Sequence, residues 1–456
     1  MFNQYKEYKK LNKGWITSMP KHWKVSKLKW LTTIYSGGTP DTTNDDYWEN
    51  GDIPWLNSGT VNQGFITEPS HLITESAVLN SSAKWVPKDA LVMALAGQGK
   101  TKGTVAILGI NATCNQSMAA IVPNEQDVNN KFLFFWLDSN YKRIRGLAGT
   151  ELRDGLNLQI IGNINCPLPP MNEQIIIANY LSNFVESVGV VIRKRLKLLS
   201  LLKEKKEAII NEAITTGFNQ ESEYENYDHD WLTRLPGNWN LKNLKFVAKH
   251  NQYSFTGGPF GSDLKNSDHT EMGVRIIQLQ NIGIGDFKNH YKIFTSQEKA
   301  DELSSCNVFP GDIIIAKMAD PVARACIVPN FDDRYLMASD GIRLEVNTNL
   351  YNVKFVEYAL NSKYFRHQAE LNSSGSTRLR IGLSTLKKLK IAAPSLVEQD
   401  RIVEKLNYIV SNIDINLEKV IMQIEKLKEY QNSFVSEAVS GQFDLRNVPS
   451  INFTKS

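Results

Sequence analysis

Two long segments of the chain place apolar residues at helical spacing. In both segments the apolar positions recur mostly at steps of three or four residues or of whole heptads, the second with one slip, as in a coiled-coil seam. The seam positions are Leu181, Val185, Val188, Ile192, Leu199, Leu202 and Ile209 in the first segment, and Leu406, Ile409, Ile413, Val420, Ile424, Leu427, Phe434 and Ala438 in the second. This pattern predicts two long helices, at 169–216 and 394–440.

The segments before the helices have a different pattern of apolar residues. Residues 14–168 and 230–393 alternate short apolar runs, such as 90–94, 105–108 and 313–316, with turn residues. Stretches at 131–139 and 353–362 have helical character. We therefore expect two globular domains of mixed α/β (α+β) class, each followed by a long helix.

The two halves are also similar in sequence. Near the start of each, GWITSMPKHWKVSKLKWL begins at Gly14 and DWLTRLPGNWNLKNLKFV begins at Asp230. Trp15, Pro20, Trp23 and Leu28 match Trp231, Pro236, Trp239 and Leu244, at a constant offset of 216 residues. A Gly-Gly pair follows in both halves, at Gly37-Gly38 and Gly257-Gly258, at slightly different distances. The chain is an internal repeat whose middle parts have diverged.

The match resumes where the helices begin. Pro169, Glu173, Gln174 and Leu181 match Pro394, Glu398, Gln399 and Leu406, now at an offset of 225 residues. The Glu-Gln pairs fall in the first helical turn, where acidic side chains suit the helix dipole; active-site carboxylates are the weaker interpretation. The expected organisation is a globular domain at 14–168, a spacer helix at 169–216, a linker at 217–229, a second globular domain at 230–393, a second spacer helix at 394–440 and a tail at 441–456.

The length of the helices constrains how they pack. A helix of about 40 residues is about 60 Å long, and alone it cannot bury its apolar stripe. The economical arrangement packs the two helices antiparallel, with a globular domain at each end and a pseudo-twofold axis between them. The alternative is that each helix folds back on its own domain or pairs with another chain.

Composition excludes several classes of protein. The chain has 456 residues, a length that suits roughly three domains, and 42% hydrophobic and 22% charged residues, as ordinary soluble proteins have. We find no apolar run of membrane-spanning length and no signal peptide, so we expect a cytoplasmic protein without membrane contact. Without any CxxC pair, the cysteines are expected to be reduced, buried thiols; they are Cys114, Cys166, Cys306 and Cys326. Asp228-His229-Asp230 lies in the expected linker, and a metal site or triad there is the weaker interpretation.

Two related domains held apart by a rigid spacer suit a ligand with two similar sites at a fixed separation. Duplex DNA presents such sites through its helical repeat. The net charge of +4 and the pI near 8.6 permit a polyanionic partner without identifying one. Domains that have diverged from each other would read different half-sites, which gives an asymmetric, split recognition sequence.

This combination resembles the specificity subunit of type I restriction-modification systems over nearly the whole chain. The resemblance rests on W-x4-P-x2-W at Trp15 and Trp231, the Gly-Gly pairs, GQGKTKGTVAI from Gly97, Pro-Gly-Asp at 310–312 and the P-x3-EQ helix starts. It implies that the two globular domains are target-recognition domains for double-stranded DNA. It also implies that the chain is not an enzyme and directs adenine methylation and restriction by partner subunits.

The resemblance implies which partners supply the chemistry. Two modification subunits, carried by the spacer helices, would bring S-adenosylmethionine, and restriction subunits would supply ATP- and Mg-dependent translocation and cleavage. The chain itself is expected to bind no cofactor, because it has neither a G-x-G-x-x-G loop nor the Asn/Asp-Pro-Pro-aromatic run of adenine methyltransferases. The segment from Ala94 to Thr101 resembles a P-loop, but a strand-like run follows it where a P-loop needs a helix.

The same segment is better interpreted as a DNA contact. Lysines neutralise phosphates, and Gln98 can offer its amide to an adenine edge in the major groove. Arg324, in the corresponding loop of the second half, suits a phosphate or a guanine. The full set of candidates is Asn57, Ser58, Gln98, Lys100, Thr101, Lys102, Asn115, Gln116, Gln278, Gln280, Asn281, Lys317 and Arg324. The alternative for each is a turn or surface residue that satisfies local backbone groups.

Other interpretations of the chain stay open. A basic run on the first helix indicates a solvated face or partner contact more than a DNA track; it comprises Arg193, Lys194, Arg195, Lys197, Lys203, Lys205 and Lys206. The main alternative function is a two-headed protein-interaction scaffold, whose affinity would depend little on salt. A fused restriction-methylation enzyme is the third interpretation, although two domains and two helices leave no room for a catalytic domain.

Overall fold

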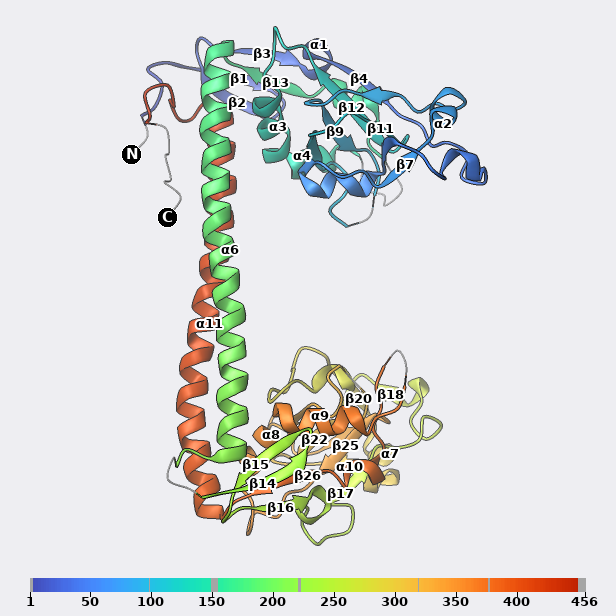
Figure 1. Cartoon of the computed structure of the whole chain (residues 1–456), viewed down its shortest axis with the longest axis vertical. Coiled ribbons are helices and arrows are strands. Elements are labelled where there is room, and N and C mark those ends of the chain that lie inside the picture. Colours follow the sequence, from blue (N-terminus) through green and yellow to red (C-terminus); the bar gives the residue numbers. More distant parts are fainter. Residues whose placement is uncertain are drawn as a thin grey trace. The chain divides into compact units, whose positions relative to one another are not determined.

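The computed structural model describes residues 3–97, 99–148, 155–219, 223–318, 320–375 and 378–449. Its contacts divide the chain into two compact units. The first unit comprises Met1–Leu196 and Met422–Ser456, and the second comprises Lys197–Ile421. Each unit therefore contains one globular part and a portion of each long helix (Figure 1).

The first unit is built from two principal sheets. One has the order β4(Thr32–Ser36)-β12(Met118–Pro123)-β9(Leu91–Ala94)-β10(Val105–Leu108)-β6(Phe65–Ile66), and the other β7(His71–Ile73)-β5(Ile53–Leu56)-β11(Ala112–Cys114)-β8(Trp85–Val86). Two antiparallel pairs accompany them, β1(Tyr8–Lys13) with β2(Ile16–Pro20) and β3(Lys24–Lys27) with β13(Asn165–Leu168). The short helices are η1(Asp45–Tyr47), η2(Ser58–Gln63), α1(Leu28–Leu31), α2(Glu75–Leu79), α3(Asn130–Ser139), α4(Tyr141–Gly146) and α5(Leu158–Gly162).

The second unit has the same kind of construction. Its sheets have the orders β17(Phe255–Gly257)-β25(Gly341–Leu344)-β22(Ile313–Ala316)-β23(Ala325–Ile327) and β18(His269–Thr270)-β20(Ile293–Thr295)-β19(Val274–Ile277)-β24(Tyr335–Met337)-β21(Asn307–Val308). The strand pairs are β14(Tyr224–His229) with β15(Leu232–Pro236) and β16(Asn240–Asn243) with β26(Lys390–Ala393). The short helices are η3(Leu244–Phe246), η4(Asn266–Asp268), η5(Leu279–Asn281), η6(Ser304–Cys306), α7(Gln297–Glu302), α8(Val353–Asn361), α9(Lys363–Leu371) and α10(Leu383–Leu386).

The strand pairings show that the repeat extends to topology. Strand β9 lies antiparallel between β12 and β10, just as β22 lies antiparallel between β25 and β23. Strands β5 and β11 run parallel, as β19 and β24 do. The predicted mixed α/β class and the two similar domains are therefore confirmed, although the middle sequences of the halves share little.

Burial explains why the first repeated motif is retained. Trp23 and Trp239 are 0% and 3% exposed, and Leu28 and Leu244 are fully buried. In the first unit the Trp23 indole also donates to the buried carboxylate of Glu173 at 3.3 Å. These residues anchor each domain to the helix that begins beside it.

The Gln of each P-x3-EQ motif ties the start of a long helix to its domain. Gln174 accepts from the Asn129 backbone at 2.8 Å and donates to the Pro169 carbonyl at 2.9 Å. Gln399 repeats the arrangement, accepting from the Asn352 backbone at 2.9 Å and donating to the Pro394 carbonyl at 2.9 Å. The Glu-Gln pairs lie in the first helical turn as predicted, and both glutamines hold backbone groups in place.

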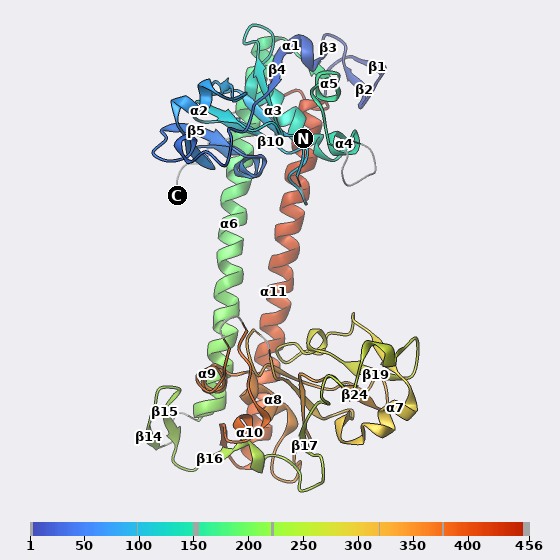
Figure 2. The ribbon, with the colours of Figure 1, turned by 90° about the vertical axis from the view of Figure 1, so that its right-hand side faces the viewer.

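The long helices are α6(Met171–Thr216) and α11(Leu396–Val439), and they pack against each other in each unit (Figure 2). In the first unit the beginning of α6 meets the end of α11, where the rings of Phe184 and Phe434 lie 4.4 Å apart. In the second unit the end of α6 meets the beginning of α11, where Lys206 Nζ lies 2.6 Å from Asp414 Oδ1. The helices are therefore antiparallel, and every predicted seam position is buried or half-buried.

One expectation about α6 is wrong. By length and composition it contains a stretch apolar enough to cross a membrane, whereas no such run was expected from the sequence. Its apolar residues have another explanation, because Ile177, Leu181, Phe184 and Val188 are buried in the core of the first unit. Packing within the protein explains these buried residues, which belong to a stretch that is 33% buried.

The folded units extend beyond the domain limits expected from the sequence. Strand β14 occupies part of the expected linker, and β1 precedes residue 14. Part of the expected C-terminal tail also belongs to the first unit, since Leu445 is 1% exposed. There the Asp444 backbone N–H donates to the Asn3 carbonyl at 2.8 Å, which brings the two ends of the described chain together.

The cysteines and the Pro-Gly-Asp motif have structural roles. Cys114, Cys166, Cys306 and Cys326 are all free and buried, as expected, and burial raises the pKa of the Cys326 thiol to about 12. Asp312 of the motif is 5% exposed and accepts from Arg343 Nε at 2.7 Å. Burial raises the pKa of the Asp312 carboxyl, and the hydrogen bond from Arg343 opposes that shift. The thiols are suited to packing rather than to reaction.

Candidate nucleic-acid interface

Three connections of the first unit meet beyond the ends of neighbouring strands. The Asn115 backbone donates to the Leu56 carbonyl at 2.9 Å, joining the exit of β11 to the exit of β5. The Leu95 backbone donates to the Ser117 carbonyl at 2.8 Å, adding the β9–β10 loop. We call residues 57–58, 95–104 and 115–117 the first loop cluster; Gln98, a predicted contact, lies outside the described residues.

The Gly-Gly pair permits this convergence. Gly38 N–H donates to the Cys114 carbonyl at 2.9 Å, and a Cβ on Gly37 would lie only 1.7 Å from that carbonyl oxygen. In the second half, a Cβ on Gly258 would lie 1.9 Å from the Ala338 carbonyl oxygen. Gly37 and Gly258 are therefore required, because the backbone at each passes directly against the end of β11 or the connection that follows β24.

The candidates of the first loop cluster divide into two groups. Asn57 caps η2 by accepting from the Gly59 backbone at 2.9 Å, and Asn115 accepts from the Ser117 backbone at 3.1 Å. These two amides hold turns, which was the alternative interpretation of each. Ser58, Thr101 and Lys102 are half-buried, while Lys100 and Gln116 are exposed. The cluster thus presents Lys100 and Gln116 most openly to a ligand.

Helix α4 adds basic residues that sequence reasoning missed. The Tyr141 hydroxyl donates to the Lys100 carbonyl at 2.8 Å, and Arg145 donates to the Gly99 carbonyl. Lys142 and Arg143 on the same helix are exposed. The sequence signal was available, since YKRIRG carries three basic residues in one short segment, but nothing in the sequence placed it beside the β9–β10 loop.

The second unit brings the equivalent connections together. The Lys317 backbone donates to the Asp340 carbonyl at 2.7 Å, and the Ala338 backbone donates to the Ile277 carbonyl at 2.9 Å. These bonds join the β22–β23 loop and the exit of β24 to the exit of β19. We call residues 278–281, 317–324 and 338–340 the second loop cluster, of which residue 319 is not described. Gln280 is exposed, and Gln278 and Lys317 are half-buried.

Two residues of this cluster that were predicted to contact DNA form hydrogen bonds to backbone carbonyls of the protein itself. Asn281 is fully buried, and its amide donates to the Lys288 and Tyr291 carbonyls at 2.9 and 2.8 Å. Arg324 donates to the Ile282 carbonyl at 2.7 Å and to the Leu279 carbonyl at 2.9 Å. Asn281 therefore holds a turn instead of facing a base, and Arg324 ties two loops together instead of presenting a free guanidinium.

Arg380 is a further residue that sequence reasoning missed. Its Nη2 donates to Asp340 Oδ1 at 2.9 Å, its side chain is half exposed, and its backbone pairs with Met318. It belongs to TRLRIGL at 377–383, which resembles TELRDGL at 150–156 in the first half. This second repeat, at an offset of 227 residues, was a signal that could have pointed to Arg380. Most of the first copy lies outside the described residues.

The loop after Ala94 differs from a P-loop in its surrounding elements. The loop after Ala94 leads into β10, which pairs antiparallel with β9, so the strand–loop–helix order of a P-loop is missing at this point. Among the described residues, no group of three or more His, Cys, Asp or Glu side chains is placed to hold a metal ion. His229 instead stacks on Trp231, with ring centroids 4.5 Å apart.

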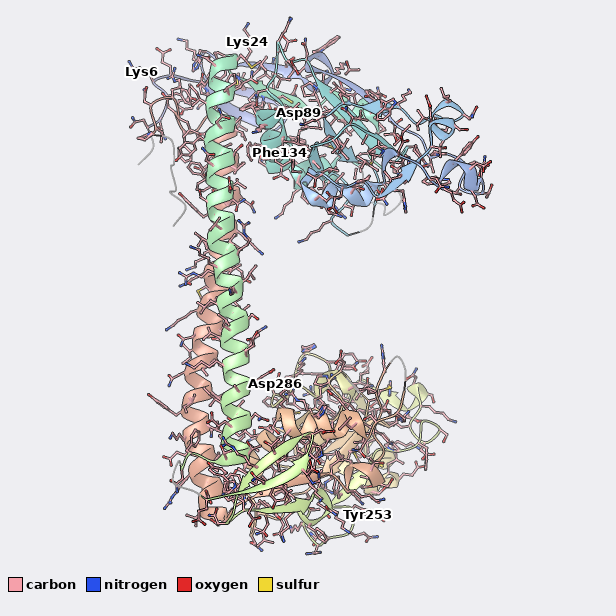
Figure 3. All side chains as sticks on the ribbon, viewed as in Figure 1. Lys6, Lys24, Asp89, Phe134, Tyr253 and Asp286 are labelled. Atoms are coloured by element: carbon pink, nitrogen blue, oxygen red, sulfur yellow. The ribbon has the colours of Figure 1, made fainter. Side chains whose placement is uncertain are left out.

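One cavity lies in the second unit, and Pro321 of the second loop cluster is among the residues that line it. It has a volume of about 730 Å³ and is lined by α6, α8, α9 and α11, with Asp286 (labelled in Figure 3), Glu357 and Arg366 among its residues. Burial raises the pKa of the Glu357 carboxyl, against the opposing charge of Lys354. Glu357 accepts from the Ile327 backbone at 2.9 Å, so it is committed to holding α8 on β23.

Comparison with known proteins gives a consistent result. A family model described as type I restriction modification DNA specificity domain matches residues 20–199 and 265–426. The MjaVIII specificity subunit of a type I restriction enzyme from Methanocaldococcus jannaschii is 21% identical over 433 residues, covering 94% of this chain and 95% of that protein. The StySPI specificity subunit from Salmonella potsdam is 20% identical over 451 residues, covering 95% and 91%.

Solved structures show the same fold. A chain from a structural study of the assembly and conformational transition of a type I R-M system matches with a TM-score of 0.69 and 17% identity, over 93% of this chain and 99% of that one. The HsdS subunit from Thermoanaerobacter tengcongensis matches with a TM-score of 0.51 and 16% identity, over 95% and 100%. The alternation of globular domain and long helix is therefore a known architecture.

Proposed function

This chain belongs to the type I restriction-modification DNA specificity family, and we propose that its two loop clusters read the two halves of a split, asymmetric DNA sequence. Its role is DNA target recognition, and it is the non-catalytic component of a larger enzyme. The alternative function, a two-headed protein-interaction scaffold without DNA specificity, is not supported. The proposal concerns which surfaces read the DNA and which partners act on it.

The observation that carries the proposal is the equivalence of the two loop clusters. Both lie where the same pair of parallel strands ends, β5 with β11 and β19 with β24. In both, a glycine packs against the backbone where the second of these strands ends, Gly37 on Cys114 and Gly258 on Ala338. Yet their exposed side chains differ: Lys100 and Gln116 in the first, Gln280 in the second, with Arg380 beside it. Two loop clusters with the same backbone arrangement and different exposed side chains suit two half-sites of different sequence.

The first loop cluster offers both kinds of contact that DNA recognition needs, and the second offers an exposed amide. Lys100, with Lys142 and Arg143 beside it, supplies positive charge for phosphates, which fix position. Gln280 carries an exposed amide that can donate to and accept from a base edge. Gln116 accepts from the Thr39 hydroxyl through Oε1, and its amide nitrogen can donate to a base. We assign the phosphate role to the basic residues and the base-reading role to the exposed amides.

The long helices suit the binding of two modification subunits. On α6 in the first unit, Val190 and Leu196 are exposed, and their counterparts on α11 in the second unit, Ile415 and Ile421, are exposed as well. Apolar residues left outside a helix pair are typical of an interface. In this proposal the modification subunits bring S-adenosylmethionine, restriction subunits use ATP and Mg, and the assembly acts on DNA in the cytoplasm.

The salt dependence of binding tests this proposal. We expect the affinity of the chain, with its candidate modification subunit, for DNA carrying its site to fall steeply with salt, since each neutralised phosphate contributes a slope of about −0.9 in log K against log salt. Fluorescence anisotropy between about 50 and 200 mM salt measures the slope. An affinity independent of salt and of DNA sequence would contradict DNA reading and favour a protein ligand.

A further inference from the structure

The repeated motif at the start of each half contains one pair of residues that packing within the chain does not explain. The two copies are aligned at the offset of 216, from Trp15 to Leu31. At eight positions both copies have an apolar residue that is buried or half-buried. At one more position both copies have an aromatic residue that is exposed, Trp30 at 70% and Phe246 at 52%. An aromatic residue has been retained at the same position in both halves, although neither ring is buried.

The surroundings of the two rings are also alike. Trp30 lies in α1 and Phe246 in η3, each preceded by a lysine. Lys29 Nζ lies 5.3 Å from the Trp30 ring centroid, and Lys245 Nζ lies 4.7 Å from that of Phe246. Among the described residues, neither lysine forms an ion pair. Each half therefore presents an exposed aromatic ring with an uncompensated positive charge beside it.

The rings lie at the far side of each sheet from the loop clusters. In the first unit, Trp30 precedes β4, and the Gly-Gly pair that contacts the first loop cluster follows it. Five residues of strand separate them, a distance of about 17 Å. In the second unit, Phe246 lies beyond the Ala248–Val346 bridge, whereas Gly258 lies at the other end of β17. The rings are thus not part of the surface proposed to read bases.

The charge around the rings is positive on both units. Lys24, labelled in Figure 3, and Lys27 lie on β3 just before α1. In the second unit, the Lys245 backbone donates to the Lys387 carbonyl at 3.1 Å, and Lys390 pairs with Asn243 across the strands β16 and β26. A complementary ligand would combine an apolar recess with carboxylates.

From this pair we propose that Trp30 and Phe246 are equivalent docking anchors for two copies of one partner protein, each presenting an acidic-rimmed apolar recess. A ligand that meets both halves in the same way accounts for an exposed aromatic retained at one position, whereas reading different half-sites would favour divergence there. The inference rests on the proposed function, and it identifies the partner as the modification subunit. Tryptophan is a typical binding hot spot, and phenylalanine is enriched at protein interfaces.

The test measures binding of the candidate modification subunit to the full-length chain, by titration and by the mass of the complex. We expect the wild-type chain to bind two copies. Trp30→Ala should weaken one of the two sites by at least about tenfold and leave the other unchanged, and Phe246→Ala should do the reverse. The double variant should weaken both sites. Trp30→Phe, which gives the first half the residue of the second, should keep two tight sites.

Two controls separate the outcomes. Phe331→Ala removes an aromatic ring that is 57% exposed and lies outside the repeated motif, and it should leave both sites intact. The DNA affinity of each variant is measured separately. Two tight sites in the double variant, or a wild-type chain that binds no modification subunit, would overturn the inference while leaving salt-dependent DNA binding to stand by itself. Loss of DNA affinity with unchanged subunit binding would also overturn it, in favour of a nucleic-acid contact.

Discussion

Replacing Lys100 and Lys142 together with glutamate is expected to weaken DNA binding by about a hundredfold near 0.15 M salt. Both side chains are exposed beside the first loop cluster, where α4 contacts the β9–β10 loop. Each lysine lost from a phosphate removes about one unit of salt slope, and each glutamate added repels the backbone. Anisotropy at several salt concentrations measures both the affinity and the slope.

The matched control carries the same change of charge at the other end of strand β9. Lys88 and Lys131 are exposed, and the Asn130 amide donates to the Asp89 carbonyl at 3.1 Å, which places both lysines away from the β9–β10 loop. Asp89 is labelled in Figure 3. Lys88→Glu with Lys131→Glu should change DNA affinity by less than about threefold. Equal losses in the two double variants would mean that net charge, and not the first loop cluster, determines binding.

Gly258→Ala is expected to destabilise the second unit by about 3 kcal/mol or more. The added Cβ would lie 1.9 Å from the Ala338 carbonyl oxygen and 2.7 Å from its carbon, so the backbone of the second loop cluster must move. For a unit of this size the loss lowers the midpoint of thermal unfolding by about 6 °C or more. Calorimetry should show the transition of the second unit shifted and that of the first unit in place.

The neighbouring glycine provides the control for this substitution. A Cβ on Gly257 would meet nothing within 4 Å. We expect Gly257→Ala to leave the unfolding midpoint unchanged or slightly raised, because alanine reduces the freedom of the unfolded chain. If Gly258→Ala were tolerated equally well, the Gly-Gly pair would not be held by the close approach described above. Its retention in both halves would then need another explanation.

The sequence was most informative where a residue's role is local or repeated. The seam of the long helices, the strand after the β9–β10 loop and the equivalence of Trp23 and Trp239 could all be predicted. They depend on spacing along one helix, on a short apolar run or on an identical motif in both halves. The correspondence between the loop after Ala94 and the loop that carries Arg324 was also predicted, because both follow a short apolar run in their half.

Individual site residues were harder to predict because their partners are distant in sequence. Arg324 bonds to the Leu279 carbonyl 45 residues away, and Tyr141 bonds to Lys100 41 residues away. No pattern along the chain shows which polar side chains a fold will use for its own backbone. Asn57 and Asn115 were predicted as DNA contacts because each carries a short amide. The same short amide makes asparagine an effective turn residue.

Single-molecule sequencing of N6-methyladenine tests the central claim most directly. Plasmid DNA is compared from cells that express this chain with its candidate modification subunit and from cells that lack the chain. We predict a split motif with a fixed spacer that appears only when the chain is present, because two different loop clusters select two different half-sites. A methylation motif that is unchanged without the chain, in cells where modification is active, would contradict the claim that this chain reads the sequence.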